Sequence, residues 1–318
     1  MLKTKLGIVF FSCAFLFLIF VHCTDEEIPA YSRNDAASKL GIPLTGSLQN
    51  PAFSPDGRAI VFTRFRDGYN TGPADIFVYH LDTYSVDTLV MDGSTNVNLP
   101  GACWNPQNQS IVFSSSRGDH DEIFMIAANG KPGEETRVTS RPAFMAYEPS
   151  FSPDGQWIVF ESHPVDVEGQ GVITKYDILG ATYLPLTGTA DDCRQPNWSP
   201  AGNLLLCQKF AGGQWDIWTM AIDGTTPVRV TSGAGDKTDA SFSGNGTLIY
   251  YSSDAGLEYA NIYKIPAGGG TPVRVTVCTG YDGAPAVSPD GMKLAFESCR
   301  GDPDGSPGTS IWILDISN

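Results

Sequence analysis

The sequence is short of basic residues. It carries 20 lysines and arginines against 35 aspartates and glutamates, which gives a formal net charge of -15. Proteins that hold nucleic acid need a basic surface for the phosphates, so this balance excludes nucleic acid as the expected partner. An acidic surface can also serve only to keep a protein soluble. The sign of the net charge does not distinguish that role from the binding of a basic partner.

Histidine is also scarce, and the sequence motifs of common enzymes are missing. Beyond the N-terminal segment only His80, His120 and His163 occur, and they do not share a repeat position. The sequence has neither the Gly-x-Ser-x-Gly elbow of hydrolases nor the Cys-x-x-Cys spacing of metal sites. We therefore expect no metal, no cofactor and no catalytic residue. A dispersed nucleophile–His–Asp arrangement or a pair of carboxylates would leave no local signature and stays open.

Long helical periods are absent, and a tight turn recurs in their place. In Ser152-Pro153-Asp154-Gly155 the proline sets the first corner, the aspartate suits the second, and the glycine takes the left-handed conformation that reverses the chain. Successive copies are 51, 47, 47, 44 and 45 residues apart. The second position of the turn falls at Pro55, Pro106, Pro153, Pro200, Gly244 and Pro289. A near-constant period of this length indicates repeated structural units.

Each unit contains four short β-runs. One run ends in the turn and a second follows it, as at residues 157–160. The third begins with Asp-Ile and an aromatic residue, as at Asp216, and the fourth contains Arg-Val-Thr, as at Arg229. Continuously apolar runs are typical of strands that are covered on both faces. We predict an all-β fold, a six-bladed β-propeller with four antiparallel strands in each blade.

The last unit has only three runs before the chain ends. Leu44 and Thr45 precede the first turn as Leu186 and Thr187 precede a later unit, so we expect residues 42–45 to complete the last blade. Such a closure removes open sheet edges. The predicted organisation is a signal segment at residues 1–22, a tether at 23–41 and a propeller at 42–318, which we expect to be a monomer.

The N-terminus has the pattern of an export signal. Lys3 and Lys5 precede an apolar run at residues 6–21, which is short for a membrane span and typical of a secretory signal. Cys23 and an acidic stretch follow, and this arrangement resembles a bacterial lipoprotein signal, although His22 stands where a small residue is usual. Lipidation at Cys23, ordinary cleavage and an uncleaved anchor are the alternatives. Each of them predicts a location in the periplasm or at the cell surface.

The repeated motifs resemble those of a known family. The Pro-Asp-Gly turn, the Ile-x-Phe run, the Asp-Ile-Tyr/Trp run and the Arg-Val-Thr run are similar to the propeller repeat of the TolB family, over about residues 42–318. TolB is the periplasmic partner of the Tol–Pal envelope system, and the resemblance implies a protein-binding role in the cell envelope. TolB proteins carry an α/β domain before the propeller, whereas only about twenty tether residues stand here, so the contacts of that family are not carried over. The same repeat class occurs in prolyl-oligopeptidase-type enzymes.

The rim opposite the Pro-Asp-Gly turns is the expected binding face, because it holds the longer and less regular loops. It is acidic, which suits a basic protein segment or a divalent ion, while solvated loop charge is the alternative. The residues expected around the channel mouth are Glu148, Asp191, Asp192, Asp236, Asp239 and Asp282. Trp215 and Tyr259 stand beside starts of third strands and are candidates for ligand stacking.

The cysteines fit an oxidising compartment without settling their state. Cys193 and Cys207 flank one turn at equal distances, and Cys278 and Cys299 flank another at nearly equal distances. Both pairs are therefore placed to face each other across hairpin arms. Disulfides within the pairs, or free thiols together with Cys103, are the two alternatives.

Two functions fit the sequence. The first is an exported, lipid-anchored and non-enzymatic propeller that binds a protein or peptide in the cell envelope. The alternative is a secreted propeller enzyme that acts on glycans as a lyase or hydrolase. An enzyme should bring titratable groups with shifted pKa values together in the channel, whereas a scaffold should carry dispersed acids around an open rim.

Overall fold

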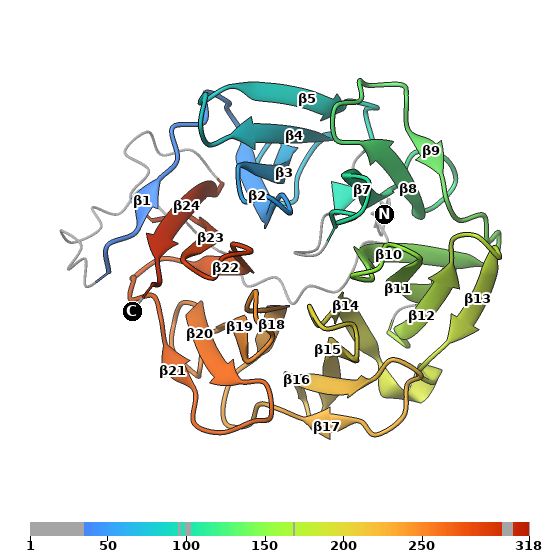
Figure 1. The fold of residues 1–318 in the computed structure, drawn as a ribbon. Coiled ribbons are helices and arrows are strands. Elements are labelled where there is room, and N and C mark those ends of the chain that lie inside the picture. The colour runs from blue at the N-terminus through green and yellow to red at the C-terminus, as the bar shows by residue number, and fades with distance from the viewer. Residues whose placement is uncertain (1–34, 95–96, 99–102, 168, 301–307, 318) are drawn as a thin grey trace, which may run out of the picture.

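The computed structural model describes residues 35–94, 97–98, 103–167, 169–300 and 308–317. Their strands form six antiparallel sheets of four strands each. Figure 1 shows these sheets as blades around a central axis, with the first strand of each blade nearest the axis. The predicted all-β, six-bladed propeller is confirmed. Within the described ranges, the single helical element is the short 3-10 helix η1 (Thr189–Asp191).

The strands take the same four places in every blade. The innermost strands are β2 (Ser47–Phe53), β6 (Val97–Asn98), β10 (Phe144–Phe151), β14 (Cys193–Trp198), β18 (Lys237–Phe242) and β22 (Asp282–Val287). The second strands are β3 (Ala59–Phe65), β7 (Ser110–Ser115), β11 (Trp157–Pro164), β15 (Leu204–Ala211), β19 (Leu248–Ser253) and β23 (Lys293–Ser298). The third strands are β4 (Ala74–His80), β8 (Glu122–Ala127), β12 (Val172–Asp177), β16 (Gln214–Ala221), β20 (Asn261–Pro266) and β24 (Ser310–Asp315). The outermost strands are β5 (Val86–Val90), β9 (Thr136–Arg137), β13 (Thr182–Pro185), β17 (Val228–Arg229), β21 (Val273–Arg274) and β1 (Ser38–Lys39).

The Pro-Asp-Gly turns are built from their own side chains. Ser152 Oγ donates a hydrogen bond to Asp154 and accepts one from Trp157 N at 2.9 Å. Gly155 takes a φ of 70°, and its amide donates to Ser152 O at 2.8 Å. The hairpin thus depends on local contacts, which explains why the motif can be copied from blade to blade.

The Asp-Ile-Trp and Arg-Val-Thr motifs meet as partners. In the fourth blade Arg229 Nη2 and Thr231 Oγ1 donate to the Asp216 carboxylate at 2.5 and 2.8 Å. Thr231 Oγ1 in turn accepts from Ile217 N at 2.9 Å. These bonds fasten the outermost strand to the third strand where the backbone ladder between them is only two residues long. The two motifs are therefore structural in this blade.

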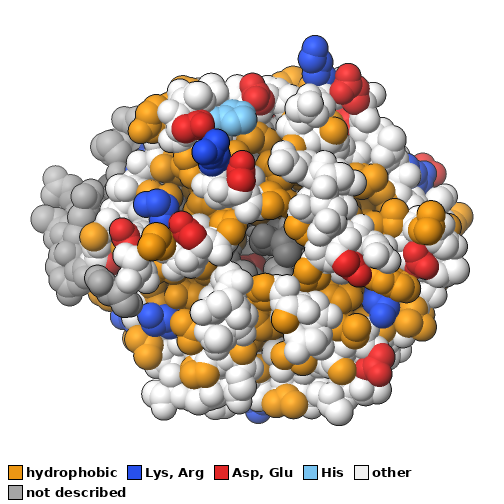
Figure 2. Space-filling model, viewed as in Figure 1, with side chains coloured by type: hydrophobic (Ala, Val, Ile, Leu, Met, Phe, Trp, Pro, Cys, Tyr) orange, Lys and Arg blue, Asp and Glu red, His pale blue; other side chains and the backbone are white. Residues whose placement is uncertain are grey.

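Apolar side chains fill the space between neighbouring blades. The residue that precedes each turn is aromatic in five blades and is buried in all five. These residues are Phe53, Trp104, Phe151, Trp198 and Phe242. Trp104 Nε1 also donates to Ala52 O in the preceding blade at 3.2 Å. Figure 2 shows a hollow at the centre of the face turned to the viewer, with acidic side-chain atoms visible inside it.

An N-terminal strand completes the last blade, as predicted, but it lies earlier in the chain than expected. Strand β1 pairs with β24 through Ser38 opposite Ile313 and Lys39 opposite Trp312. The prediction that residues 42–45 form this strand is wrong. Ile42 and Leu44 pack instead against the buried cluster around Phe62 that joins the last and first blades. Their apolar pattern serves that packing and not a ladder.

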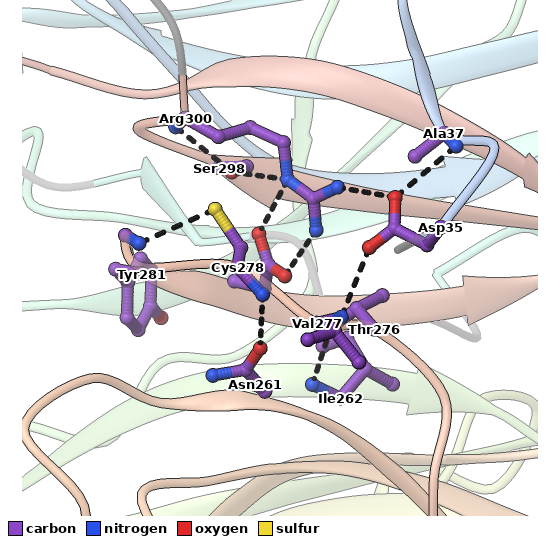
Figure 3. Close-up of polar contacts among 12 residues, drawn as sticks. Asp35, Ala37, Asn261, Ile262, Thr276, Val277, Cys278, Tyr281, Ser298 and Arg300 are labelled. Carbon is purple, nitrogen blue, oxygen red and sulfur yellow. Dashed lines mark hydrogen bonds and ion pairs between the residues drawn. The ribbon is translucent and has the colours of Figure 1, made fainter. Parts of the chain in front are cut away.

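The segment before β1 is bound to the last blade by a buried ion pair. Asp35 Oδ1 accepts a hydrogen bond from Arg300 Nη1 at 2.7 Å, and Asp35 Oδ2 accepts one from Val277 N at 2.9 Å. Figure 3 shows the Arg300 guanidinium between Asp35 and Ser298. Residues 35–41, which we assigned to the tether, therefore contact the ring. We call the Asp35, Arg300 and Asp282 side chains the closure cluster.

The predicted signal segment, Cys23 and the first part of the tether lie outside the described residues. In the part of the chain that the structure describes, no helix has the length and apolar character needed to cross a membrane.

Candidate functional site in the central channel

The innermost strands carry the same β-bulge at the same distance from the turn. In five blades the pairing register shifts there, and the bulged residue has a left-handed backbone with φ between 45° and 52°. These residues are Asn50, Glu148, Gln195, Asp239 and Ala284. The equivalent position of the second blade lies outside the described residues. Left-handed conformations are uncommon for residues other than glycine, and bulges of this kind redirect side chains next to functional sites.

Three of the bulged residues join across neighbouring blades. Gln195 Nε2 donates to Glu148 Oε1 at 3.1 Å and to Asp239 Oδ1 at 2.9 Å. Gln195 Oε1 accepts from Asp239 N at 2.9 Å. One amide therefore links two carboxyl groups from the blades on either side of it. We call Glu148, Gln195 and Asp239 the channel triad.

A second layer of side chains supports the triad from β11. Glu161 Oε2 accepts from Gln195 N at 3.2 Å, and Glu161 Oε1 bonds to His163 Nε2. His163 Nδ1 lies 3.0 Å from Gly169 O, which can only accept, so Nδ1 donates this hydrogen bond. Burial lowers the pKa of His163, but the hydrogen bond to Glu161, the charge of Glu161 and the hydrogen bond to Gly169 O together outweigh burial, so the pKa is raised.

A further buried carboxyl group lies where the last blade meets the first. Glu297 Oε2 accepts from the bulge amide Asn50 N at 2.9 Å. Glu297 Oε1 accepts from Tyr69 Oη at 3.0 Å and from Tyr281 Oη at 3.1 Å. Burial raises the pKa of Glu297 to about 7 against these donors, and the charge of Asp239 adds to the increase.

The triad acids also titrate abnormally. Burial raises the pKa of Glu148 well above its usual range, and the charge of Glu161 contributes to the same increase. Burial likewise raises the pKa of Asp239, although Gln195 and Thr238 donate hydrogen bonds to it. Three carboxyl groups along the channel therefore favour the protonated form more than free side chains do.

The other acids predicted at the channel mouth have local partners. Asp191 pairs with Lys209 at 2.6 Å, and Asp192 pairs with Arg194 at 3.0 Å. Asp236 accepts a hydrogen bond from Trp215 N at 2.8 Å. Asp282 is fully buried against Arg300 in the closure cluster, so its side chain is not displayed at a solvent-exposed mouth. Of the six predicted acids, the structure brings Glu148 and Asp239 together in the channel triad.

The two predicted stacking residues differ in surroundings. Trp215 is buried, with the Arg194 guanidinium 4.9 Å from its ring centroid and the Phe210 ring at 5.2 Å. The Trp215 ring is therefore already covered by other side chains of the protein. Tyr259 is partly exposed, and its carbonyl accepts from Asn261 Nδ2 at 3.2 Å. Ligand stacking on either ring stays a prediction.

The cysteine pairs lie within single blades. Cys193 and Cys207 are buried on adjacent strands, and a hydrogen bond between their thiols, followed by burial, raises the pKa of Cys207. Tyr281 N donates to Cys299 Sγ at 3.2 Å, and Gly280 N donates to Cys278 Sγ at 3.2 Å. All four are present as thiols, and the disulfide alternative stays a prediction. In the described ranges, no three His, Cys, Asp or Glu side chains are arranged to hold a metal ion.

The residues that the sequence reasoning missed share fixed offsets from the turn. Gln195 lies five residues before Pro200, as Glu148 lies five before Pro153. Glu161 and Glu297 each lie eight residues after the proline of their own turn. An alignment of the units on the turn would have marked both positions, whereas charge alone pointed to the loops.

The fold and the channel define a class of protein: a six-bladed propeller whose axis is lined by bulged polar and acidic residues. Residues 45–204 and 187–305 match the family profile of the TolB β-propeller domain. The chain belongs to this family, which confirms the resemblance seen in the repeats.

Several relatives are partial matches to this chain. The Tol-Pal system protein TolB of Francisella tularensis subsp. mediasiatica is 29% identical over 161 residues, which are 50% of this chain and 35% of that protein. The Tol-Pal system protein TolB of Francisella tularensis subsp. holarctica (strain OSU18) gives the same values. The match thus spans about a third of the length of these relatives.

Solved structures share the fold at low identity. TolB of Agrobacterium tumefaciens has a TM-score of 0.64 at 17% identity and covers 85% of this chain and 91% of that chain. TolB of Acinetobacter baumannii has 0.63 at 18%, with 86% and 64% covered. An oligogalacturonate lyase in complex with manganese has 0.61 at 13%, with 89% and 94% covered. These likenesses show the fold alone.

Proposed function

We propose that the chain is an exported, lipid-anchored and non-enzymatic propeller that binds a basic protein or peptide segment at its channel. The observation that carries the proposal is the channel triad, where Glu148 and Asp239 from different blades meet at one amide nitrogen. Two carboxyl groups held this close bind positive charge in their ionised form, and a bound cation would offset the burial that raises their pKa values. The Tol-Pal system proteins among the relatives support a protein partner.

The charge balance favours the channel over the outer mouth as the binding surface. Asp191 is paired with Lys209, and Asp192 is paired with Arg194. Paired charges attract an incoming cation weakly, since their fields largely cancel at a distance. We therefore place the partner contact on Glu148 and Asp239.

Envelope capture tests this proposal. The protein is immobilised and incubated with detergent-solubilised envelope, and recovered proteins are compared for the natural sequence and for Glu148→Gln/Asp239→Asn. The matched control is Asp82→Asn/Glu258→Gln, which removes two exposed acids elsewhere. We expect the channel variant to lose a partner that the control retains. Equal recovery by all three proteins would remove the channel from the proposal.

The anchor has its own experiment. The apolar run at residues 6–21 followed by Cys23 supports lipidation of that cysteine. Mass spectrometry of the mature N-terminus should find a lipidated Cys23 as the first residue. A mature chain that begins at another residue, or one that keeps Met1, would contradict the anchor and leave the channel proposal standing.

An enzyme acting on glycans is the second candidate. Three channel carboxyl groups with raised pKa values favour it, because this is the arrangement that acid–base chemistry needs. The likeness in fold to an oligogalacturonate lyase is consistent with it. Incubation with oligogalacturonate and other acidic and neutral glycans, followed by chromatography of the products, separates the candidates. Cleavage that Glu148→Gln abolishes would favour the enzyme.

A further inference from the structure

A second position repeats along the channel wall, eight residues after the second turn residue. It is occupied by Thr63, Ser114, Glu161, Gln208, Ser252 and Glu297. Four of these side chains bond to the innermost strand of the following blade. Glu161 and Glu297 accept a hydrogen bond from the bulge amide of that strand, at 3.2 and 2.9 Å. Thr63 and Ser252 donate to a backbone carbonyl there, at 3.2 and 3.0 Å.

Ser114 and Gln208 break this pattern. Both side chains are more than nine-tenths buried, yet Ser114 Oγ and Gln208 Oε1 have no hydrogen-bond partner among the described residues. The blades that follow them are the two whose bulged residues are acids, Glu148 and Asp239. At the equivalent position, Glu161 and Glu297 face the bulge amide of the following blade, which for Gln208 is Asp239 N, and that amide already donates to Gln195 Oε1 at 2.9 Å.

A buried amide oxygen without a donor is costly, so its retention at the position that faces the Asp239 bulge favours a donor supplied from outside. The donor must be cationic, because it also meets Glu148 and Asp239. A metal ion suits the place less well, since in the part of the chain that the structure describes no three acidic, His or Cys side chains are arranged to hold one.

We propose that the channel binds the primary ammonium group of a lysine side chain between Glu148 and Asp239, with Gln208 Oε1 as the third acceptor. An ammonium group has three donors in a tetrahedral arrangement, which matches three acceptors from three different side chains. A guanidinium group instead prefers both oxygens of one carboxylate in a plane, and one oxygen of each acid here already accepts from Gln195. The inference rests on the proposed function and names the chemistry of the partner.

Isothermal titration with defined probes tests the ammonium site. The probes are a capped tri-lysine peptide, its tri-arginine and tri-norleucine counterparts, and spermidine as a free polyamine. We expect tri-lysine to bind at least about threefold more tightly than tri-arginine and than spermidine, and tri-norleucine to give no binding. Equal or tighter binding of tri-arginine would overturn the ammonium assignment, and tighter binding of spermidine would overturn the lysine side chain as its source.

Variants separate the site from the net charge of the protein. We expect Glu148→Gln/Asp239→Asn to weaken tri-lysine binding about tenfold or more, and the control Asp82→Asn/Glu258→Gln to change it less than twofold. The same loss in both variants would overturn the site, because a general attraction between opposite charges would then account for binding.

Gln208→Met adds a readout that a purely structural role would not give. The native amide oxygen has no bond to lose, so the unfolding midpoint should stay the same or rise, while the tri-lysine affinity falls about threefold to tenfold. A lower midpoint with unchanged affinity would contradict the proposal.

The capture experiment distinguishes this inference from the function on which it rests. Suppose that the natural protein does not bind tri-lysine, while Glu148→Gln/Asp239→Asn still loses the envelope partner. That result would overturn the ammonium site and leave the scaffold function in place. Loss of neither partner nor peptide binding would overturn both.

Discussion

Asp35 and Arg300 stand 265 positions apart and form a buried ion pair with 2.7 Å between Oδ1 and Nη1. Arg300 also holds Asp282, with 3.0 Å between Nε and Oδ1. The pair joins the start of the described chain to the last blade, beside the two-residue ladder of β1. Ring closure therefore depends on side chains as well as on strand pairing.

We expect the closure cluster to contribute unequally to stability. Asp282→Asn removes the buried negative charge that faces Arg300 and replaces one of its two acceptor oxygens with an amide nitrogen that cannot accept, which should lower the free energy of unfolding by about 3 kcal/mol. Asp35→Asn leaves Arg300 paired with Asp282 and should cost about 1 kcal/mol. Urea unfolding measures both, and the exposed substitution Asp82→Asn is the control. Equal costs for the two variants would contradict the arrangement.

Stability should fall as the pH rises from about 4.5 to about 7. The folded pKa of Glu297 is about 7 because of burial, against an ordinary value of 4.5. The folded state therefore keeps a proton that the unfolded state has lost, so this contribution is complete below pH 4.5 and disappears as the pH passes 7. The slope from one such group is at most about 1.4 kcal/mol per pH unit.

Glu297→Gln removes this titration and keeps an acceptor for Asn50 N. Urea unfolding at several pH values between 4.5 and 8 should give a shallower slope for this variant than for the natural sequence. Glu258→Gln, at an exposed position, should leave the slope unchanged. Identical slopes for all three proteins would show that Glu297 titrates normally.

Two turn glycines should differ in their tolerance of alanine. Gly155 and Gly291 both have left-handed backbones, with φ of 70° and 74°. An added Cβ at Gly155 would lie 2.5 Å from Asn105 Oδ1, whereas at Gly291 it meets no described atom within 4 Å. Gly291→Ala should therefore cost about 1 kcal/mol from backbone strain alone, and Gly155→Ala about 2 kcal/mol. Thermal unfolding compares them, and an equal loss would mean that Asn105 moves aside freely.

Disulfides, if the protein forms them, should link cysteines of one blade. The Cys193 and Cys207 thiols are hydrogen-bonded to each other, whereas Cys278 and Cys299 both contact the Gly280–Tyr281 backbone of the last blade. Peptide mapping without reduction should find the pairs 193–207 and 278–299 and no mixed pair. Reduction of the first link should lower stability by about 3 kcal/mol, because it frees a loop of about 15 residues. A mixed pair would contradict the blade assignment.

The repeat made the architecture predictable because its information is local. Ser152, Asp154 and Gly155 form their turn through contacts with one another, so each copy of the motif predicts a hairpin from the sequence. The closing strand was placed four residues too late for a different reason. Ile42 and Leu44 carry the apolar pattern of a strand, but a neighbouring blade provides the surface on which they pack.

The same distinction between local and tertiary information applies to the candidate site. Charge and loop length pointed to six acids, and Glu148 and Asp239 among them line the channel. The sequence alone settles the number of blades, the turn chemistry and the acidic balance, since each follows from neighbouring residues or from composition. The tertiary fold assigns Asp282 to Arg300 and brings Gln195 between two acids, because those contacts join separate strands or blades and depend on the curvature of the closed ring.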